Sequence, residues 1–134
     1  HKNMATITAQ IKILSTDLLT DELSLDTTFK MSGVLATTGL ARTKVTAQAA
    51  GDSDITSLLP ASGWAAPVYL YIKNTDSTAT NYLFVYSSTG SNPIIAKIAG
   101  GEWAFVPYGL SIPLLVYGTA ATSVMEYMIF GTEA

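Results

Sequence analysis

The chain has 134 residues, the usual size of one domain, which is long enough to bury a core without disulfides or metals. It contains no cysteine, so disulfides, thiolate metal sites and thiol nucleophiles are excluded. Only 13 % of its residues are charged, its net charge is −3, and Arg42 is its one arginine. Binding to a nucleic-acid backbone needs clustered lysine and arginine, so we expect no nucleic-acid partner.

The apolar stretches of the chain are too short to cross a membrane as helices. The longest, GLSIPLLVYG, is broken by Pro113 and falls well short of the roughly 20 residues of a membrane helix. No signal peptide is visible, and we expect no membrane partner. Residues 1–3 precede Met4, and we interpret them as a remnant of protein expression, so that the natural chain would contain no histidine.

Alternating hydrophobic residues predict two strands near the N-terminus. Residues 5–14 place alanine or isoleucine at every second position, and residues 19–31 repeat this period of two. Thr16 and Asp17 could cap a short helix that ends at Leu23, but the alternation continues past Leu23 and favours a strand. We expect residues 4–16 to form an N-terminal strand or arm.

A third strand is predicted over residues 40–49 and is followed by an irregular loop. The loop is rich in glycine, aspartate, serine and proline, and residues 54–59 could form one helical turn within it. Its GDSD segment has alternating carboxylates, as calcium loops do, but the rest of the calcium-loop pattern is missing. We therefore interpret Asp52 and Asp54 as turn or cap residues and expect no metal site.

The second half of the chain predicts a series of short strands. Residues 68–73 and 81–87 alternate on both sides of the polar segment NTDSTAT and predict a hairpin. Further strands are predicted over residues 94–98, 102–106, 112–117 and 123–130. Eight to ten short strands with turn signals between them are typical of an all-β protein. We expect residues 1–134 to form one antiparallel β-sandwich domain, jelly-roll-like in its topology.

Aromatic residues gather in the second half. Phe29 and Trp64 are the only ones before residue 67. The later strands are apolar on both faces, whereas a sheet with one wet face is apolar on the other face only. Either the chain itself or a second copy covers the extra apolar face, and interface cores are rich in aromatic residues and poor in charge. The residues expected at an oligomer interface are Tyr69, Tyr71, Tyr82, Phe84, Tyr86 and Tyr127.

Side chains with catalytic chemistry are scarce. His1 is the only histidine, and no glycine-rich phosphate-binding motif occurs. Two carboxylates could cleave a glycoside, but no spacing singles out a pair among the candidates, which are Asp52, Asp54, Asp76, Glu102 and Glu126. We expect no enzymatic activity and no cofactor.

Two tryptophans and one glutamate are the remaining candidate residues. Trp64 and Trp103 could stack on a sugar ring, although a lone tryptophan in a β-sandwich is more often part of the core or of an interface. Glu126 lies in the apolar segment VMEYMIF, where a buried carboxylate needs a cationic partner; an exposed edge or a channel on a symmetry axis are alternatives. The candidate partners of Glu126 are Lys97, Lys73 and Arg42.

Residues 67–107 contain, in order, an apolar YIKN strand, a short polar turn, a second aromatic strand and the segment KIAGGEWAFVP. This order resembles small structural proteins of tailed-phage virions, and the opening stretch LLTDELSLDTTFKM resembles them more loosely. Such proteins often form β-sandwich or jelly-roll trimers that decorate or cement capsids, or that belong to heads, tails and fibers. The resemblance implies a virion location and a structural, self-assembling role.

Two functional hypotheses follow from these observations. The first is a non-enzymatic virion protein that self-associates as a homotrimer and decorates or cements a phage capsid. Its partners would be further copies of the chain and the major capsid protein or other virion proteins. The second is a carbohydrate- or receptor-binding module of a phage tail or fiber, which keeps the fold and changes its use.

Overall fold

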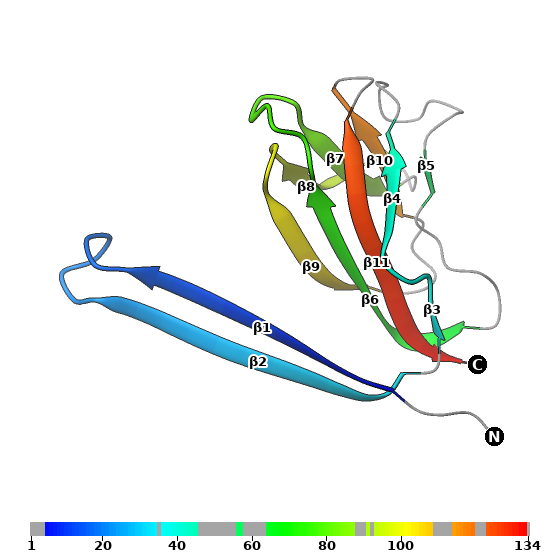
Figure 1. Ribbon diagram of the computed structural model, residues 1–134, viewed down its shortest axis with the longest axis horizontal. Coiled ribbons are helices and arrows are strands. Elements are labelled where there is room, and N and C mark those ends of the chain that lie inside the picture. The colour runs from blue at the N-terminus through cyan, green and yellow to red at the C-terminus, as the bar shows by residue number, and fades with distance from the viewer. Residues whose placement is uncertain are drawn as a thin grey trace. The chain divides into compact units, whose positions relative to one another are not determined.

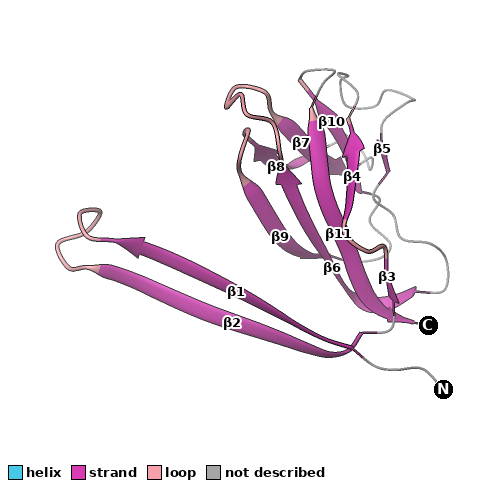
Figure 2. Ribbon diagram, in the orientation of Figure 1, coloured by secondary structure: helices cyan, strands magenta, loops and turns pink. Residues whose placement is uncertain are grey.

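The computed structural model of the chain is all-β (Figures 1 and 2). It describes residues 5–34, 36–45, 56–57, 64–87, 91, 93–108, 114–119 and 123–133. Within these ranges every regular element is a strand and every strand pair is antiparallel. The chain divides into two compact units, His1–Leu35 and Ala36–Ala134.

The first unit is a hairpin of two long strands, β1 (Ala5–Ser15) and β2 (Leu23–Val34), which we call the arm. The two strands pair from Ala5 opposite Val34 to Ser15 opposite Leu23. The Ser15 hydroxyl accepts the backbone N–H of Leu18 at 3.0 Å and so holds the start of the connection. The alternation of residues 5–14 thus predicts β1 correctly, because a period of two is the repeat of a strand.

The second unit is an antiparallel β-sandwich of two sheets (Figure 1). The large sheet places β3 and β4 beside β11, followed by β6 and β9, and the small sheet has the order β5-β10-β7-β8. The bounds of these strands are β3 (Ala36–Thr37), β4 (Ala41–Lys44), β5 (Thr56–Ser57), β6 (Trp64–Asn74), β7 (Leu83–Ser87), β8 (Ile94–Ile98), β9 (Trp103–Tyr108), β10 (Leu114–Gly118) and β11 (Val124–Glu133).

The strand pairs of the sandwich are nested along the chain. β7 pairs with β8, β6 with β9, β5 with β10, and β4 with β11. Two further pairings, β6 with β11 and β7 with β10, complete the sheets. From β4 onward, each connection between described strands crosses from one sheet to the other, except the turn between β7 and β8.

The hairpin predicted from residues 68–73 and 81–87 does not form. β6 lies in the large sheet and β7 in the small one, so residues 75–82 form a crossover between sheets. The apolar residues of the two strands therefore pack face to face across the sandwich instead of side by side. Alternation marks one apolar face on each strand, but it does not say whether two such faces adjoin or oppose each other.

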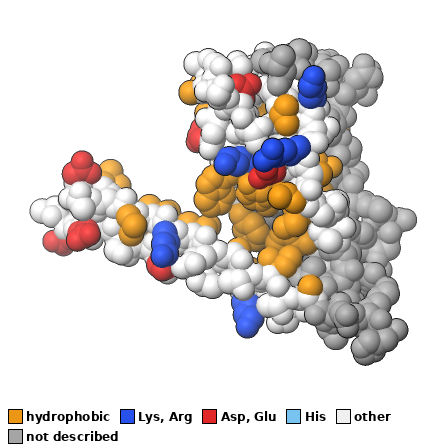
Figure 3. Space-filling view, in the orientation of Figure 1, with side chains coloured by type: hydrophobic (Ala, Val, Ile, Leu, Met, Phe, Trp, Pro, Cys, Tyr) orange, Lys and Arg blue, Asp and Glu red, His pale blue; other side chains and the backbone are white. Residues whose placement is uncertain are grey.

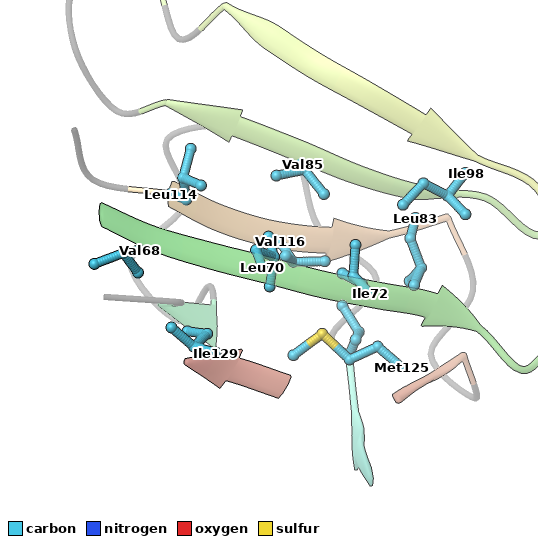
Figure 4. Packing of buried hydrophobic residues seen from close by; sticks show 11 residues of the cluster. Val68, Leu70, Ile72, Leu83, Val85, Ile98, Leu114, Val116, Met125 and Ile129 are labelled. Atoms are coloured by element: carbon cyan, nitrogen blue, oxygen red, sulfur yellow. The ribbon is translucent and has the colours of Figure 1, made fainter. Parts of the chain in front are cut away.

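The core fills the space between the inner faces of the two sheets (Figure 4). All of its residues are at most 4 % exposed. They are mainly branched aliphatic side chains that alternate with outward-facing residues along each strand. The cluster consists of Val45, Val68, Leu70, Ile72, Leu83, Val85, Ile98, Leu114, Val116, Met125 and Ile129.

The domain and strand predictions need three corrections. The N-terminal unit contains both of the first strands, not residues 4–16 alone, because β1 and β2 pair with each other in the described residues. The second strand starts at Leu23 and not at residue 19, and residues 16–21 form bends in place of either a strand or a helix. Thr56 and Ser57 form the short strand β5, whereas the sequence also allows a helical turn over residues 54–59.

Asn74 ties the crossover to both sheets. It ends β6 and is fully buried. Its side-chain amide donates to the carbonyl oxygens of Asn81 at 2.7 Å and Ile98 at 3.0 Å, while its Oδ1 accepts the N–H of Asp76 at 3.1 Å. A single side chain therefore holds the end of β6, the crossover and the end of β8, with all of these polar groups paired.

The turn between β8 and β9 lies close against the same crossover. A Cβ atom on Gly100 would come within 2.4 Å of the Thr78 carbonyl oxygen and 2.8 Å of the Asp76 carbonyl oxygen, which real Cβ atoms do not do. The N–H of Gly101 also donates to the carbonyl of Asn74 at 2.8 Å. The crossover and this turn are thus fixed to each other at one end of the sandwich.

Replacing Asn74 with leucine should destabilise the sandwich. Two carbonyl oxygens would lose their donor, and unpaired buried acceptors cost about 1–3 kcal/mol each, so we expect the free energy of unfolding to fall by about 2–6 kcal/mol in urea denaturation. Thr80→Ala, at an exposed position of the same crossover, should change it by less than about 0.5 kcal/mol. A leucine variant as stable as the parent chain would contradict this role of Asn74.

Candidate interaction surfaces

The outer face of the large sheet carries aromatic and basic side chains where a solvated sheet would carry polar ones. Strand register arranges them in rows across β11, β6 and β9. The rows are Phe130, Tyr69 and Pro107; Met128, Tyr71 and Phe105; and Glu126, Lys73 and Trp103. Figure 3 shows hydrophobic side chains gathered over this sheet. We define the aromatic face as Tyr69, Tyr71, Trp103, Phe105, Met128 and Phe130.

Three rings of the aromatic face stack on one another. The Tyr69 ring centroid lies 5.8 Å from that of Phe105 and 5.5 Å from that of Phe130, with interplanar angles of 11° and 25°. Such pairs contribute about 0.5–1.5 kcal/mol beyond the area they bury. Phe130 is 2 % exposed and Tyr69 9 %, whereas Trp103 is 51 % exposed. The face is therefore covered at its Phe130 end and open to solvent at its Trp103 end.

Glu126 lies at the open end of the aromatic face and binds Arg42. Its Oε2 accepts the Arg42 Nε–H at 2.9 Å, and the Arg42 Nη2 lies 2.9 Å from the same oxygen. Its Oε1 accepts the Tyr71 hydroxyl at 3.0 Å. The hydrogen bonds from Arg42 and then Tyr71 lower the pKa of Glu126, while burial and the bond to Glu126 raise the pKa of Tyr71. Arg42 is thus the partner among the three expected cations.

The open end of the aromatic face carries an excess of positive charge. Arg42 lies opposite Glu126 on β4, and Lys73 lies opposite it on β6. Lys44 follows two residues after Arg42, points to the same face and is exposed. We call Arg42, Lys44 and Lys73 the basic end, since Glu126 compensates one of these three charges.

A second aromatic cluster lies on the outer face of the small sheet. The Phe84 and Tyr117 rings stack at 5.0 Å, and Tyr86 meets Tyr117 edge-on at 5.6 Å. The Lys97 Nζ lies 4.1 Å from the centroid of the Tyr82 ring, which is a cation–π geometry. Tyr86 is 1 % exposed, whereas Tyr82, Phe84 and Tyr117 are partly exposed.

The residues expected at one oligomer interface lie on three different faces. Those of β6 belong to the aromatic face, and those of β7 and just before it belong to the cluster on the small sheet. Tyr127 differs from the expectation, since it packs against the hydrophobic core. Its register explains this position, because Tyr127 lies opposite the core residue Ile72 on the neighbouring strand and so shares its face.

The two tryptophans have different places in β-strands. Trp64 begins β6, but its side chain lies outside the described residues. Trp103 begins β9, is half-exposed and lies opposite Lys73. Trp103 therefore remains available as a surface contact.

The candidate carboxylates of the described segments have local partners. Asp76 accepts the N–H of Thr78 at 2.8 Å, and this bond lowers its pKa. Glu102 accepts the N–H of Ala99 at 3.0 Å, which closes the turn before β9. Residues 51–54 lie outside the described residues. In the part of the chain that the structure describes, no group of three histidine, aspartate or glutamate residues could hold a metal ion.

Sequence reasoning did not assign several residues of these surfaces, Met128 and Lys44 among them. Phe105, Phe130 and Tyr117 were counted only as part of the aromatic excess, and Arg42 only as a possible partner of Glu126. An alternation signal is present in the sequence, because Tyr117 and Phe130 are out of phase with the core residues Val116 and Ile129, and Phe105 is out of phase with Ala104, which packs against the core. The sequence does not indicate which strands are neighbours in a sheet. The aromatic residues could therefore not be grouped into the two clusters.

Comparisons with known protein families, with curated proteins and with solved structures found no match to this chain. Among the described residues there is no helix of the length and apolar character needed to cross a bilayer. What the chain does must therefore be inferred from its own surfaces.

The ion pair of Glu126 should make stability depend on pH. Because the folded-state pKa of Glu126 is lowered, its ionised form stabilises the fold above the unfolded-state pKa of about 4.3, and this stabilisation is lost as the pH falls through the folded-state value. Glu126→Gln should therefore reduce the free energy of unfolding at pH 7, and the difference from the parent chain should shrink below about pH 4.

Urea denaturation at pH 7, 5 and 3 measures this difference. The control is a double-mutant cycle with Arg42→Met, in which the two effects should be non-additive at pH 7 because both substitutions break the same pair. Strictly additive effects at pH 7, or a difference that grows as the pH falls, would contradict the assignment.

Proposed function

We propose that this chain is a non-enzymatic structural protein of a tailed-phage virion. In this role it self-associates, as a homotrimer, and decorates or cements the capsid. The resemblance of residues 67–107 to small virion proteins suggests the class, and the aromatic outer face of the large sheet carries the proposal. A large apolar patch on a monomer would be a liability, so a face that holds Trp103, Tyr71 and Phe105 argues for a protein partner.

We further propose that the sandwich is a jelly roll. The nested pairing of β4 with β11, β5 with β10, β6 with β9 and β7 with β8 supports this topology. Jelly rolls occur in viral capsid proteins and in lectins, which is compatible with a virion role. A fold does not define a function, however, and the outer faces therefore carry more weight than the topology.

Weak contacts would suffice for such a protein. A closed ring of copies presents the same surface several times, and simultaneous docking at several capsid sites raises the overall affinity without any new contact. Only 13 % of the residues are charged. A surface with so few charges is more typical of a protein that is buried in an assembly than of a small soluble monomer.

Self-association and capsid binding can be tested separately. Size-exclusion chromatography with light scattering at micromolar concentration should give the mass of three chains. Capsids would then be prepared from a phage that normally encodes this chain but whose copy of the gene has been deleted. The purified chain should co-sediment with these capsids. A stable monomer would contradict self-association, and an oligomer that leaves capsids unbound would contradict decoration.

A second candidate function is binding of a carbohydrate or receptor by a phage tail or fiber module. The half-exposed indole of Trp103 favours it, since it lies opposite Lys73 in the row that continues across the sheet to Glu126 and Arg42. Sugar-binding sites combine an aromatic ring with polar groups in this way.

A glycan array distinguishes the second candidate from the first. If Trp103 stacks on a sugar, binding should be lost in Trp103→Ala and retained in Lys97→Ala, which lies on the small sheet. Absence of binding to any glycan, together with binding to capsids, would exclude this function in favour of the first.

A further inference from the structure

Four side chains form a continuous row across the open end of the large sheet. Arg42 on β4 lies opposite Glu126 on β11. Lys73 on β6 lies between Glu126 and Trp103, which begins β9. Residues paired in this way point to the same face of a sheet, and Figure 3 shows basic side chains around an acidic one beside the hydrophobic side chains of this face. Neighbouring strands lie about 4.8 Å apart, so the row extends over about 14 Å.

The Arg42 guanidinium is held in one orientation by Glu126. Its Nε and Nη2 both lie 2.9 Å from the Glu126 Oε2. The Oε1 of the same carboxylate accepts the Tyr71 hydroxyl at 3.0 Å, and the Glu126 side chain is only 13 % exposed, so it is not free to turn away. The Arg42 side chain is itself 71 % exposed. A guanidinium that is fixed in place and faces solvent is already organised to bind an anion.

The guanidinium of Arg42 has hydrogen-bond donors to spare. It has five N–H groups, and the contacts with Glu126 use two of them. Within the described part of the chain, the other three have no acceptor. Two parallel N–H groups on the outer edge of a guanidinium match the two oxygens of a carboxylate. Lys44 and Lys73 lie on the same face and add positive charge on either side of Arg42.

Trp103 provides an aromatic ring at the other end of the row. Its side chain is 51 % exposed. Sugar sites use such a ring to stack on the apolar face of a sugar, and polar groups beside the ring fix the orientation of the ligand. An acidic peptide would use the cations and leave the indole unused. The combination of an indole with an oriented guanidinium therefore favours a sugar that carries a carboxylate.

Two further carboxylates lie near this end of the sandwich but outside the row. Asp76, in the crossover, accepts the N–H of Thr78 at 2.8 Å, and Glu102, in the turn before β9, accepts the N–H of Ala99 at 3.0 Å. Both offset part of the positive charge of the basic end. Recognition of an anion must therefore depend on the oriented guanidinium of Arg42 and on the indole more than on long-range attraction.

We propose that this row binds an acidic glycan, with one sugar stacked on Trp103 and a carboxylate of the same glycan held by Arg42. This inference rests on the second candidate function, carbohydrate binding, and names its ligand class, which is a glycan that contains uronic acids or other carboxylated sugars. The length of the row suits an oligosaccharide that lies across the strands. Glu126 is a positioning residue of this site, since it acts on the ligand only through Arg42.

Polymers of known chemistry test the ligand class. We would measure the retardation of the purified chain by affinity electrophoresis in gels that contain polygalacturonate, a polymer of uronic acids, or dextran, a neutral glycan, or polyglutamate, an acidic peptide. Half-maximal retardation should need at least about tenfold less polygalacturonate than either other polymer, because only polygalacturonate combines sugar rings with carboxylates. Equal binding of polyglutamate would overturn the glycan in favour of an acidic protein partner.

Two substitutions distinguish an oriented site from a merely positive surface. Arg42→Lys keeps the charge but loses the paired donors, so binding to polygalacturonate should weaken about tenfold. Glu126→Gln removes a negative charge, which would strengthen binding if charge alone mattered. It should instead weaken binding, because Arg42 loses the carboxylate that orients it. Unchanged binding in Arg42→Lys, or tighter binding in Glu126→Gln, would overturn the proposal.

Matched controls accompany these variants. Glu22→Gln makes the same change of charge at an exposed position of the arm and should leave binding unchanged, as should Lys97→Ala on the small sheet. Trp103→Ala should weaken binding at least about tenfold, and Trp103→Phe should restore part of it, because a phenyl ring keeps a stacking surface. Full binding by Trp103→Ala would overturn the role of the indole. Arg42→Lys remains decisive if Glu126→Gln fails to fold.

The outcomes separate this inference from the proposed functions. Equal binding of dextran and polygalacturonate, lost in Trp103→Ala, overturns the acidic ligand and leaves the sugar-binding candidate standing. Binding to none of the polymers and to no acidic glycan of an array overturns the inference itself. Self-association and capsid binding are measured without any glycan, so the virion proposal stands or falls independently of both results.

Discussion

The face-to-face packing of β6 against β7 determines the rest of the sandwich. Leu70 and Ile72 meet the inner side chains of the small sheet, and the crossover that this packing requires is held by the buried amide of Asn74. Because side chains alternate along a strand, the same packing turns Tyr69 and Tyr71 outward on one sheet and Phe84 outward on the other. One interior contact therefore sets the character of both outer surfaces.

These outer surfaces differ in what they offer a partner. The small-sheet cluster is capped by Lys97, whose ammonium group lies over an aromatic ring. The aromatic face of the large sheet is instead open at Trp103 and bordered by an ion pair and two further lysines. An open apolar area beside excess positive charge suits a partner that is apolar and acidic.

Much of this could be read from the sequence. Strict alternation in residues 5–14 predicts β1 and its apolar face, and the segment at 94–98 predicts the bounds of β8, because period two and turn residues are local properties. The aromatic excess of the second half indicates that more than one face is apolar. The sequence limits the candidate partners of Glu126 to three cationic side chains. In the structure its partner is Arg42, which lies opposite it on the neighbouring strand β4.

What the sequence alone determined was the all-β class, most strands and the phase of their apolar residues, since these depend on each residue and its near neighbours. Only the tertiary structure decided that residues 68–73 and 81–87 lie in opposite sheets, that Tyr127 belongs to the core side, and that the first two strands form a separate arm. The physical reason is that two strands with apolar faces can bury them either side by side or face to face. The choice between these arrangements depends on contacts between residues far apart in the chain, such as those of Asn74 with Ile98, and not on local pattern.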